Sequence, residues 1–251
     1  MHEQVIPHDE WNTSPPKLPR ASKIELPPIH GVLPFDGVRS PSSRSAASQK
    51  VFLTYRTEAD NWTPRIGICE SAAEAAVAIE LLFSPNIFDL KFQPAQVSYF
   101  DEEDGKHHKH THDLLVEFRT GERRLIFVRN AASLKKPRTT RQIQLIAQAS
   151  RKKRLAHDMV VANATDYTRQ RRDNLFRMFL FASAPDPEAD EIVLAVASRL
   201  KTLWHMQDIF PHVGIDQSRA FAACYRLVAR KQLWANLDHV LWERSRIEVA
   251  S

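Results

Sequence analysis

Residues 111–129 read THDLLVEFRTGERRLIFVR, two apolar segments separated by a Thr-Gly turn. Short runs of aliphatic and aromatic residues on either side of a glycine turn are typical of a β-hairpin. A similar run follows Pro94, so the pattern predicts three strands, Ala95 to Phe100, Thr111 to Phe118 and Arg124 to Arg129. We therefore expect a three-stranded meander at the centre of the chain.

Helical patterns flank these strands. Residues 71–83, SAAEAAVAIELLF, form an alanine-rich segment in which Ser71 and Glu74 have the spacing of a capping box. Residues 139–155 keep apolar side chains at helical spacing among basic and amide residues, which predicts a helix that covers the sheet. A short strand is expected at residues 159–164. The fold class that follows is α/β, with a mixed sheet flanked by helices.

Composition divides the chain into three parts. Proline and serine crowd residues 1–50, which predicts a disordered tail, although Ile29, Val32, Leu33 and Phe35 could dock as an extended strap. The sheet and its helices occupy residues 51–185, and the prolines of SAPDPE at residues 183–188 indicate a boundary. Residues 186–251 predict three helices followed by a hairpin, the order of a small winged-helix domain.

Charge and composition narrow the class of protein. Lysine and arginine exceed aspartate and glutamate by five and the pI is about 9.3, which favours a polyanionic partner. Cys69 and Cys224 lie far apart in apolar segments, so we expect two core thiols rather than a disulfide. Residues 1–11, MHEQVIPHDEW, show neither the basic start nor the apolar stretch of a signal peptide, and no apolar run approaches about 18 residues. The sequence therefore predicts a cytoplasmic protein without a membrane partner.

Five short motifs in the central segment resemble one known family. They are ESAAE at residues 70–74, FQP at 92–94, DGK at 104–106, THDLLV at 111–116 and LIFVR at 125–129. They are similar to the E-S-x-x-E, Q-P, D-G-K, T-P-D-F-L-V and I-E-V-K or Q-V-K motifs of the TnsA transposon endonucleases. That family belongs to the restriction-endonuclease-like PD-(D/E)xK superfamily. The resemblance runs from about Val51 to Ala182, and a carboxy-terminal winged helix also matches the family's layout.

The resemblance implies a metal-dependent nuclease site that has lost two of its four residues. In the family, acidic or amide groups bind Mg²⁺ and a lysine helps orient the attacking water. Glu74 and Asp113 match two of the metal ligands, whereas Phe127 stands at the third ligand and Arg129 at the lysine. A phenyl ring has no oxygen or nitrogen atom that could bind a metal, and a guanidinium cannot lose a proton as a lysine ammonium can. We therefore expect no bound metal, or weakly bound Mg²⁺ or Mn²⁺.

The function that the resemblance implies is that of a TnsA-like DNA-binding subunit or accessory protein of a transposon-type mobile element. Its partners would be double-stranded DNA and a transposase or other mobile-element protein, and its nuclease site would be inactive. One alternative is an active endonuclease that nicks 5′ transposon ends, with Glu70, Glu80 or Glu117 supplying the missing ligand. Another is a DNA-binding regulator. Structural roles also stay open, with Glu74 only a helix cap and Asp113 only a turn acceptor.

Basic residues mark the expected DNA-binding surface. They flank the predicted helix at 139–155, continue just beyond it and recur in the last predicted helix, at Lys135, Lys136, Arg138, Arg141, Arg151, Lys152, Lys153, Arg154, Arg171, Arg172, Arg219 and Arg226. Lysine and arginine side chains neutralise phosphates and release counterions. Two other interpretations remain, a solvated charged face and, for the last helix, a surface that docks a protein.

A histidine cluster precedes the second predicted strand. Alternate positions would place His108, His110 and His112 on one strand face, with His107 beside them, which is compatible with a zinc site. Lys106 and Lys109 interrupt the cluster, and no cysteine lies nearby. An exposed hairpin is therefore the favoured interpretation.

Overall fold

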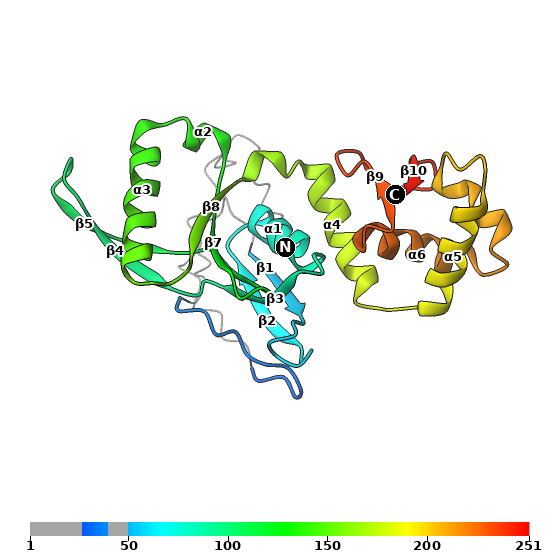
Figure 1. The fold of residues 1–251 in the computed structure, drawn as a ribbon, viewed down its shortest axis with the longest axis horizontal. Helices are drawn as coiled ribbons and strands as arrows, with labels where there is room; N and C mark the ends of the chain where they lie inside the picture. Colours follow the sequence, from blue (N-terminus) through cyan, green and yellow to red (C-terminus); the bar gives the residue numbers. More distant parts are fainter. Residues whose placement is uncertain (1–26, 40–49, 251) are drawn as a thin grey trace, which may run out of the picture.

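A four-stranded mixed sheet forms the centre of the larger lobe in the computed structural model, which describes residues 27–39 and 50–250 (Figure 1). Its order is β3 (Ile87–Phe92), β6 (Leu114–Phe118), β7 (Arg123–Arg129) and β8 (Asp158–Asn163). The first three strands are antiparallel, and β8 runs parallel to β7. A parallel neighbour requires a crossover, which α3 (Pro137–Lys152) supplies. The predicted α/β class is confirmed.

The predicted meander is wrong in its pairing. β4 (Gln96–Asp101) pairs with β5 (Lys106–Thr111) as a separate hairpin arm, whereas β3 takes the place beside β6. The arm begins after a turn at Gln93, whose φ is 48°. The main-chain N–H of Gln93 donates to Asp113 O at 2.9 Å, and the N–H of His112 donates to Ala95 O at 3.0 Å. These bonds join the arm to the sheet, so the segment predicted as one strand from Thr111 to Phe118 divides at His112.

Helix α1 packs an alanine-rich face against the hairpin of β1 (Val51–Tyr55) and β2 (Arg65–Cys69). It spans Ala72–Leu82, and the hydroxyl of Ser71 accepts the N–H of Glu74 at 3.2 Å, so the predicted helix and its cap are confirmed. Ala75, Ala76 and Ala78 are fully buried. Side chains this small allow neighbouring backbones to approach closely.

The described part of the predicted tail is a docked strap. Residues 27–39 run beside β2, where the N–H of Leu33 donates to Pro64 O at 2.7 Å and Leu33 O accepts from the N–H of Ile66 at 3.0 Å. Asp36 pairs with Arg65 at 3.0 Å, and Phe35 packs against the core. For residues 27–39 the expected disorder is therefore replaced by the alternative strap. Residues 1–26 and 40–49 lie outside the described residues.

The smaller lobe contains α5 (Pro187–Arg199), α6 (Gln217–Ala229) and the antiparallel strands β9 (Leu233–Ala235) and β10 (Ile247–Val249) (Figure 1). Two 3₁₀ turns, η3 (Met206–Asp208) and η4 (Phe210–His212), stand where a short helix was predicted. Pro211 lacks a main-chain donor, which disfavours a continuous α-helix there. An isolated antiparallel bridge pairs His205 with Arg246, the residue immediately before β10.

Helix α4 (Arg169–Ala182) joins the two lobes, because it contacts both α1 and α6. Asn174 of α4 is fully buried and binds the loop between β9 and β10. Its Nδ2 donates to Leu237 O at 2.8 Å and to His239 O at 2.6 Å, while its Oδ1 accepts the N–H of Leu241 at 3.0 Å. The predicted boundary near residue 185 follows α4, but this helix packs on both sides of it.

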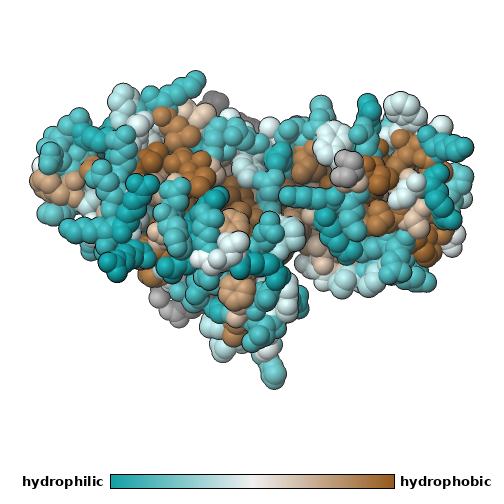
Figure 2. Space-filling view, viewed as in Figure 1, coloured by the Kyte–Doolittle hydropathy of each residue, from teal (hydrophilic) through white to brown (hydrophobic). Residues whose placement is uncertain are grey.

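Tryptophan side chains lie on the surface of the described residues. Trp62, Trp204, Trp234 and Trp242 are 58%, 56%, 51% and 49% exposed. Figure 2 shows hydrophilic side chains over most of one face, with hydrophobic ones between them in both lobes. In the part of the chain that the structure describes, no helix is long and apolar enough to cross a membrane.

Candidate functional site

Two carboxylates meet where α1 and β6 begin. Glu74, in the first turn of α1, accepts the main-chain N–H of Glu70 at 2.8 Å, and its other oxygen lies 3.2 Å from the Ser71 hydroxyl. Asp113 immediately precedes β6 and accepts the N–H of Val128 from β7 at 2.7 Å. Two backbone N–H groups, one from the segment before α1 and one from β7, therefore hold the pair in place.

Burial and mutual repulsion set the protonation of this pair. Burial raises the pKa of Asp113 to about 7, and the neighbouring Glu74 carboxylate raises it as well, against the opposing effects of the Val128 hydrogen bond and Arg129. Burial also raises the pKa of Glu74 above its ordinary value. The two groups are close enough to oppose each other's ionisation. The structure thus brings together two of the predicted site residues, with Arg129 within electrostatic reach.

Phe127 fills the position predicted for the missing ligand. Its ring is fully buried among Val97, Ile146 and neighbouring apolar side chains of β4 and α3. The His110 ring meets it edge-on at a centroid distance of 4.6 Å. The guanidinium carbon of Arg129 lies 4.0 Å from the phenyl centroid, so Arg129 rests on the ring as a cation–π contact.

The residues around the pair do not fit a tightly held magnesium ion. Across residues 27–39 and 50–250, three acidic, histidine or cysteine ligand atoms lie within 4.8 Å of one another only at Asp101, Asp104 and His108. Glu74 and Asp113 therefore have no third ligand of these types at that range. Mg²⁺ requires near-octahedral oxygen coordination, and two side chains would leave most positions to water.

Of the three glutamates considered as replacement ligands, only Glu70 is near the pair. It adjoins α1 and forms an ion pair with Arg39 of the strap. Glu80, two turns further along α1, is bound by Arg171 at 2.6 Å and by the Tyr167 hydroxyl. Glu117 stands opposite Arg123 on the sheet. The suggestion that Glu80 or Glu117 completes the site is therefore wrong.

His110 and His112 lie inside the protein and do not join His108 at a common metal site. Ser150 donates its hydroxyl proton to Ile146 O, so His112 Nε2, 2.9 Å from Ser150 Oγ, must be the donor in that bond. Burial lowers the pKa of His110 to about 3 and that of His112 to about 4. Both rings are therefore neutral at physiological pH.

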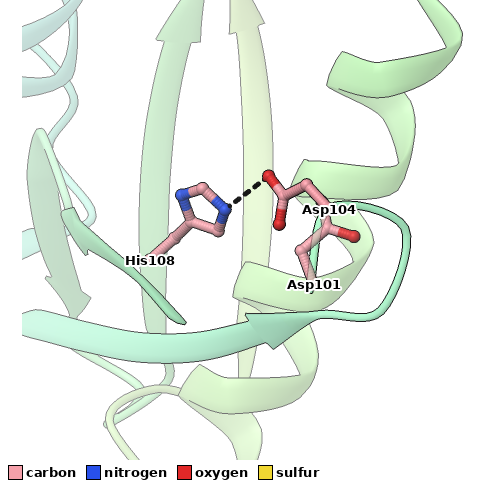
Figure 3. A group of neighbouring side chains, drawn as sticks. All are labelled: Asp101, Asp104 and His108. Carbon is pink, nitrogen blue, oxygen red and sulfur yellow. Dashed lines mark hydrogen bonds and ion pairs between the residues drawn. The ribbon is translucent and has the colours of Figure 1, made fainter. Parts of the chain in front are cut away.

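Two aspartates of the hairpin arm lie close to His108, and the sequence did not lead us to expect this group. Figure 3 shows Asp104 facing His108 across the β4–β5 hairpin, with Asp101 beside Asp104. The histidine cluster suggested a metal site made of imidazoles alone. The available signal was a pair of aspartates three residues apart before a glycine turn, followed by His108 four residues after the second aspartate.

The exposed basic side chains gather at the two ends of α3. Lys135, Lys136 and Arg138 precede or open the helix, and Arg151, Lys152, Lys153 and Arg154 close it; all seven are exposed. Three of them make further contacts: Arg138 with Asp104 at 3.8 Å, Arg151 with Asp158 at 3.5 Å and Lys153 with Gln96 O at 3.3 Å. A helix of 16 residues is about 24 Å long, so the two groups are well separated.

Several predicted DNA contacts are already engaged within the protein. Arg226 is 2% exposed and its Nε lies 2.7 Å from the equally buried Asp190, so its assignment to DNA was wrong. Arg219 pairs with Asp186 at 2.8 Å and with Glu188 at 2.7 Å. These partners lie more than 30 residues away in sequence, which hid them from a local pattern.

The remaining predicted arginines near the sheet are also partly engaged. Arg141 forms ion pairs with Asp101 and Glu103 at the hairpin arm. Arg171 binds Glu80, and Arg172 beside it is only partly exposed. The exposed positive charge of the predicted positions is therefore concentrated at the ends of α3 rather than distributed over all of them.

Models of known protein families give no match to this chain, and a search of curated protein sequences finds no significant relative.

Proposed function

We propose that this chain is a TnsA-like DNA-binding subunit or accessory protein of a transposon-type mobile element, with a nuclease-like site that does not cut DNA. The observation that carries the proposal is the pairing of Glu74 and Asp113 beside Phe127 and Arg129. A helix residue and a residue at the start of a strand, far apart in sequence, meet where the family resemblance implies a metal site. A mixed sheet flanked by helices is also what that resemblance implies.

Loss of cleavage follows from Phe127. Its ring is fully buried against His110, Arg129 and apolar side chains, so an ion at the third-ligand position would meet hydrocarbon in place of oxygen. Glu74 and Asp113 already accept backbone hydrogen bonds, and their raised pKa values weaken them as metal ligands near neutral pH. Protons compete with a metal for the same oxygens.

DNA binding is assigned to the two basic ends of α3. Seven exposed lysine and arginine side chains lie there, and each phosphate that they neutralise contributes a salt-dependent increment of affinity. The N-terminus of α3 has no side-chain cap and begins with Pro137, so the main-chain N–H of Arg138 is the group that can also face a phosphate. The basic residues before α3 therefore add charge to a favourable helix end.

The smaller lobe is assigned to contacts with a protein partner such as a transposase. Its order of helices followed by a β-hairpin supports a winged-helix domain, in which α6 would be the DNA-reading helix. Arg219 and Arg226 of α6 are held by aspartates, however, which favours a docking role. Three exposed tryptophans, at 204, 234 and 242, are typical of side chains that dominate protein interfaces.

Two assays test this proposal together. Fluorescence anisotropy with a labelled 30-base-pair duplex should show binding that weakens steeply as salt increases. A nicking assay on supercoiled DNA with Mg²⁺ and then Mn²⁺ should show no product above the metal-free background. Absence of duplex binding at low salt would reject DNA as the partner.

An active endonuclease remains the second candidate, and one observation favours it. Glu70 is close enough to raise the pKa values of both Glu74 and Asp113, so a third carboxylate is available near the pair. It would have to leave its ion pair with Arg39. Metal-dependent nicking that disappears in Glu70→Gln, Glu74→Ala and Asp113→Ala would establish this function in place of the first.

A further inference from the structure

The tip of the β4–β5 hairpin gathers three metal-binding side chains. Asp101 ends β4, Asp104 lies in the turn and His108 stands on β5 (Figure 3). One ligand atom from each lies within 4.8 Å of the other two. This group is separate from Glu74 and Asp113.

Contacts outside the group hold each ligand in position. Asp101 Oδ1 accepts the N–H of Glu103 at 3.1 Å and also receives the guanidinium of Arg141. Asp104 Oδ1 accepts the N–H of Lys106 at 3.0 Å, across a turn that Gly105 allows with a φ of +64°. Groups that fix the ligating side chains in this way reduce the entropy lost when a metal binds.

The imidazole is oriented from two sides. His108 stacks on the buried ring of Tyr99, with centroids 5.4 Å apart and an interplanar angle of 24°. Its Nε2 lies 2.9 Å from Asp104 Oδ2. A cation inserted between these two atoms would replace the shared proton. The His108 and Asp104 side chains are each 30% exposed, so an ion can enter from solvent.

We propose that Asp101, Asp104 and His108 bind one divalent transition-metal ion of the Zn²⁺ type. Two carboxylate oxygens and one imidazole nitrogen suit a borderline-soft cation, and three protein ligands leave a fourth tetrahedral position for water. Mg²⁺ prefers an all-oxygen octahedron and fits this set less well. Metal binding at the hairpin arm is independent of DNA binding.

The neighbouring arginines reduce affinity without blocking the site. The Arg141 and Glu103 contacts of Asp101 fall on Oδ1. Arg138 is 3.8 Å from Asp104, and its side chain is 78% exposed, so it can turn into solvent. An ion here would link both strands of the arm, while Arg141 continues to connect the arm to α3.

Zinc titration of the untagged, full-length, metal-stripped protein tests the proposal. Calorimetry at pH 7.5 should show saturable binding with a component of one ion per chain, and Co²⁺ should produce visible absorption bands typical of a low-symmetry site. His108→Ala and Asp104→Asn should each weaken that component by at least about tenfold. His107→Ala removes an exposed neighbouring histidine and should leave it unchanged. Binding should also weaken at acidic pH, because protons compete with the metal for its ligand atoms.

Circular dichroism and thermal unfolding of the metal-free variants establish that the fold is intact. Asp101→Asn is not suitable as a test, because it would also release Arg141. Absence of a one-ion component in the wild type would overturn the proposal. Equal weakening by His107→Ala and His108→Ala would also overturn it, because that result describes adventitious binding to a histidine-rich strand.

Discussion

Asp113 is easier to protonate in the folded protein than in an unfolded chain, because it is buried beside Glu74. Its pKa of about 7 lies above the ordinary 3.8. The stability that the neutral carboxyl contributes is therefore fully present below about pH 3.8 and is lost as pH rises through 7. An asparagine side chain would accept the Val128 N–H without a charge, so Asp113→Asn should be more stable than the wild type by roughly 2–4 kcal/mol at pH 8.5.

Urea unfolding at pH 5 and pH 8.5 measures this effect. The advantage of Asp113→Asn should shrink clearly at pH 5, where the wild-type carboxyl is mostly protonated in the folded state. Glu191→Gln, which removes an exposed carboxylate of α5, serves as the charge-matched control and should change little at either pH. A stabilisation of equal size at both pH values would contradict the assigned cause.

Phe127 and Arg129 can be changed together to test whether the nuclease-like site is eroded. Phe127→Glu with Arg129→Lys supplies the absent ligand and the ammonium, so the double variant should bind Mn²⁺ more tightly than the wild type. Burial of a new carboxylate among apolar side chains opposes this gain and costs several kcal/mol where it stays unpaired. Phe127→Leu with Arg129→Lys is the matched control and should gain no binding.

Paramagnetic resonance of Mn²⁺ measures the free ion, after circular dichroism has established folding. If Phe127→Glu with Arg129→Lys is folded but binds Mn²⁺ no better than its leucine control, the predicted ligand position is misplaced. Where the double variant unfolds, Phe127→Gln with Arg129→Lys offers an uncharged ligand at the same position. If this glutamine variant is folded but binds Mn²⁺ no better than the leucine control, the predicted ligand position is likewise misplaced.

At the residue scale, local roles could be predicted from the sequence better than distant partners. The cap of Ser71 on α1 depends on residues three apart, and it is present as expected. The pairing of Glu74 with Asp113 came from a family resemblance rather than from spacing. Arg226 was misassigned because its partner Asp190 lies on another helix, and no local pattern marks a buried ion pair of that kind.

At the C-terminal end of α3, the proposed DNA binding leads to a quantitative prediction. Replacing Arg151, Lys152, Lys153 and Arg154 with alanine should flatten the plot of log affinity against log salt, by about 0.9 for each phosphate that is no longer neutralised. Anisotropy titrations at four salt concentrations measure the slope. Lys201→Ala, on the other lobe, is the control for a general decrease in charge. An unchanged slope in the quadruple variant would exclude this end of α3 from the footprint.

Strand pairing was the least predictable property of the elements. Most strands and long helices were found near their predicted positions, because hydrophobic periodicity is local. β5 was expected only as part of an exposed hairpin and without strand bounds, since Lys106, His107 and Lys109 conceal its alternation, yet it pairs along its whole length with β4. The replacement of β4 by β3 beside β6 depends on the turn at Gln93, which the sequence marks only by the following proline.

The two lobes of the whole molecule are tied together through Asn174. Asn174→Ala would remove two donors and one acceptor, leaving Leu237, His239 and Leu241 backbone groups without this partner. We expect a decrease of roughly 3 kcal/mol in the free energy of unfolding, because unsatisfied buried polar groups are costly. Calorimetric unfolding should show the decrease, whereas Gln170→Ala, at an exposed position of α4, should not. Equal stability of Asn174→Ala and the wild type would contradict this role.

The division of the molecule was predicted only in part. Prolines near residue 185 mark the start of α5, but the apolar core extends from the sheet through α4 into α6. Composition identifies a break in the chain and does not show which neighbours a preceding helix contacts. The strap at residues 33–36 was hard to predict for the same reason, since its contacts with Arg65 depend on a strand that was not predicted.

The exposed tryptophans determine which optical signal reports on this protein. Indole emission depends on the polarity around the ring, and the four described tryptophans already meet water in the native state. Denaturation should therefore change the emission of these rings little, whereas a partner that covers Trp204, Trp234 or Trp242 should change it strongly. Arg246 rests near Trp204 and Arg244 near Trp242, so a polyanion that withdraws these guanidinium groups should also alter the fluorescence. The emission of these four tryptophans is thus better suited to following docking than to following unfolding.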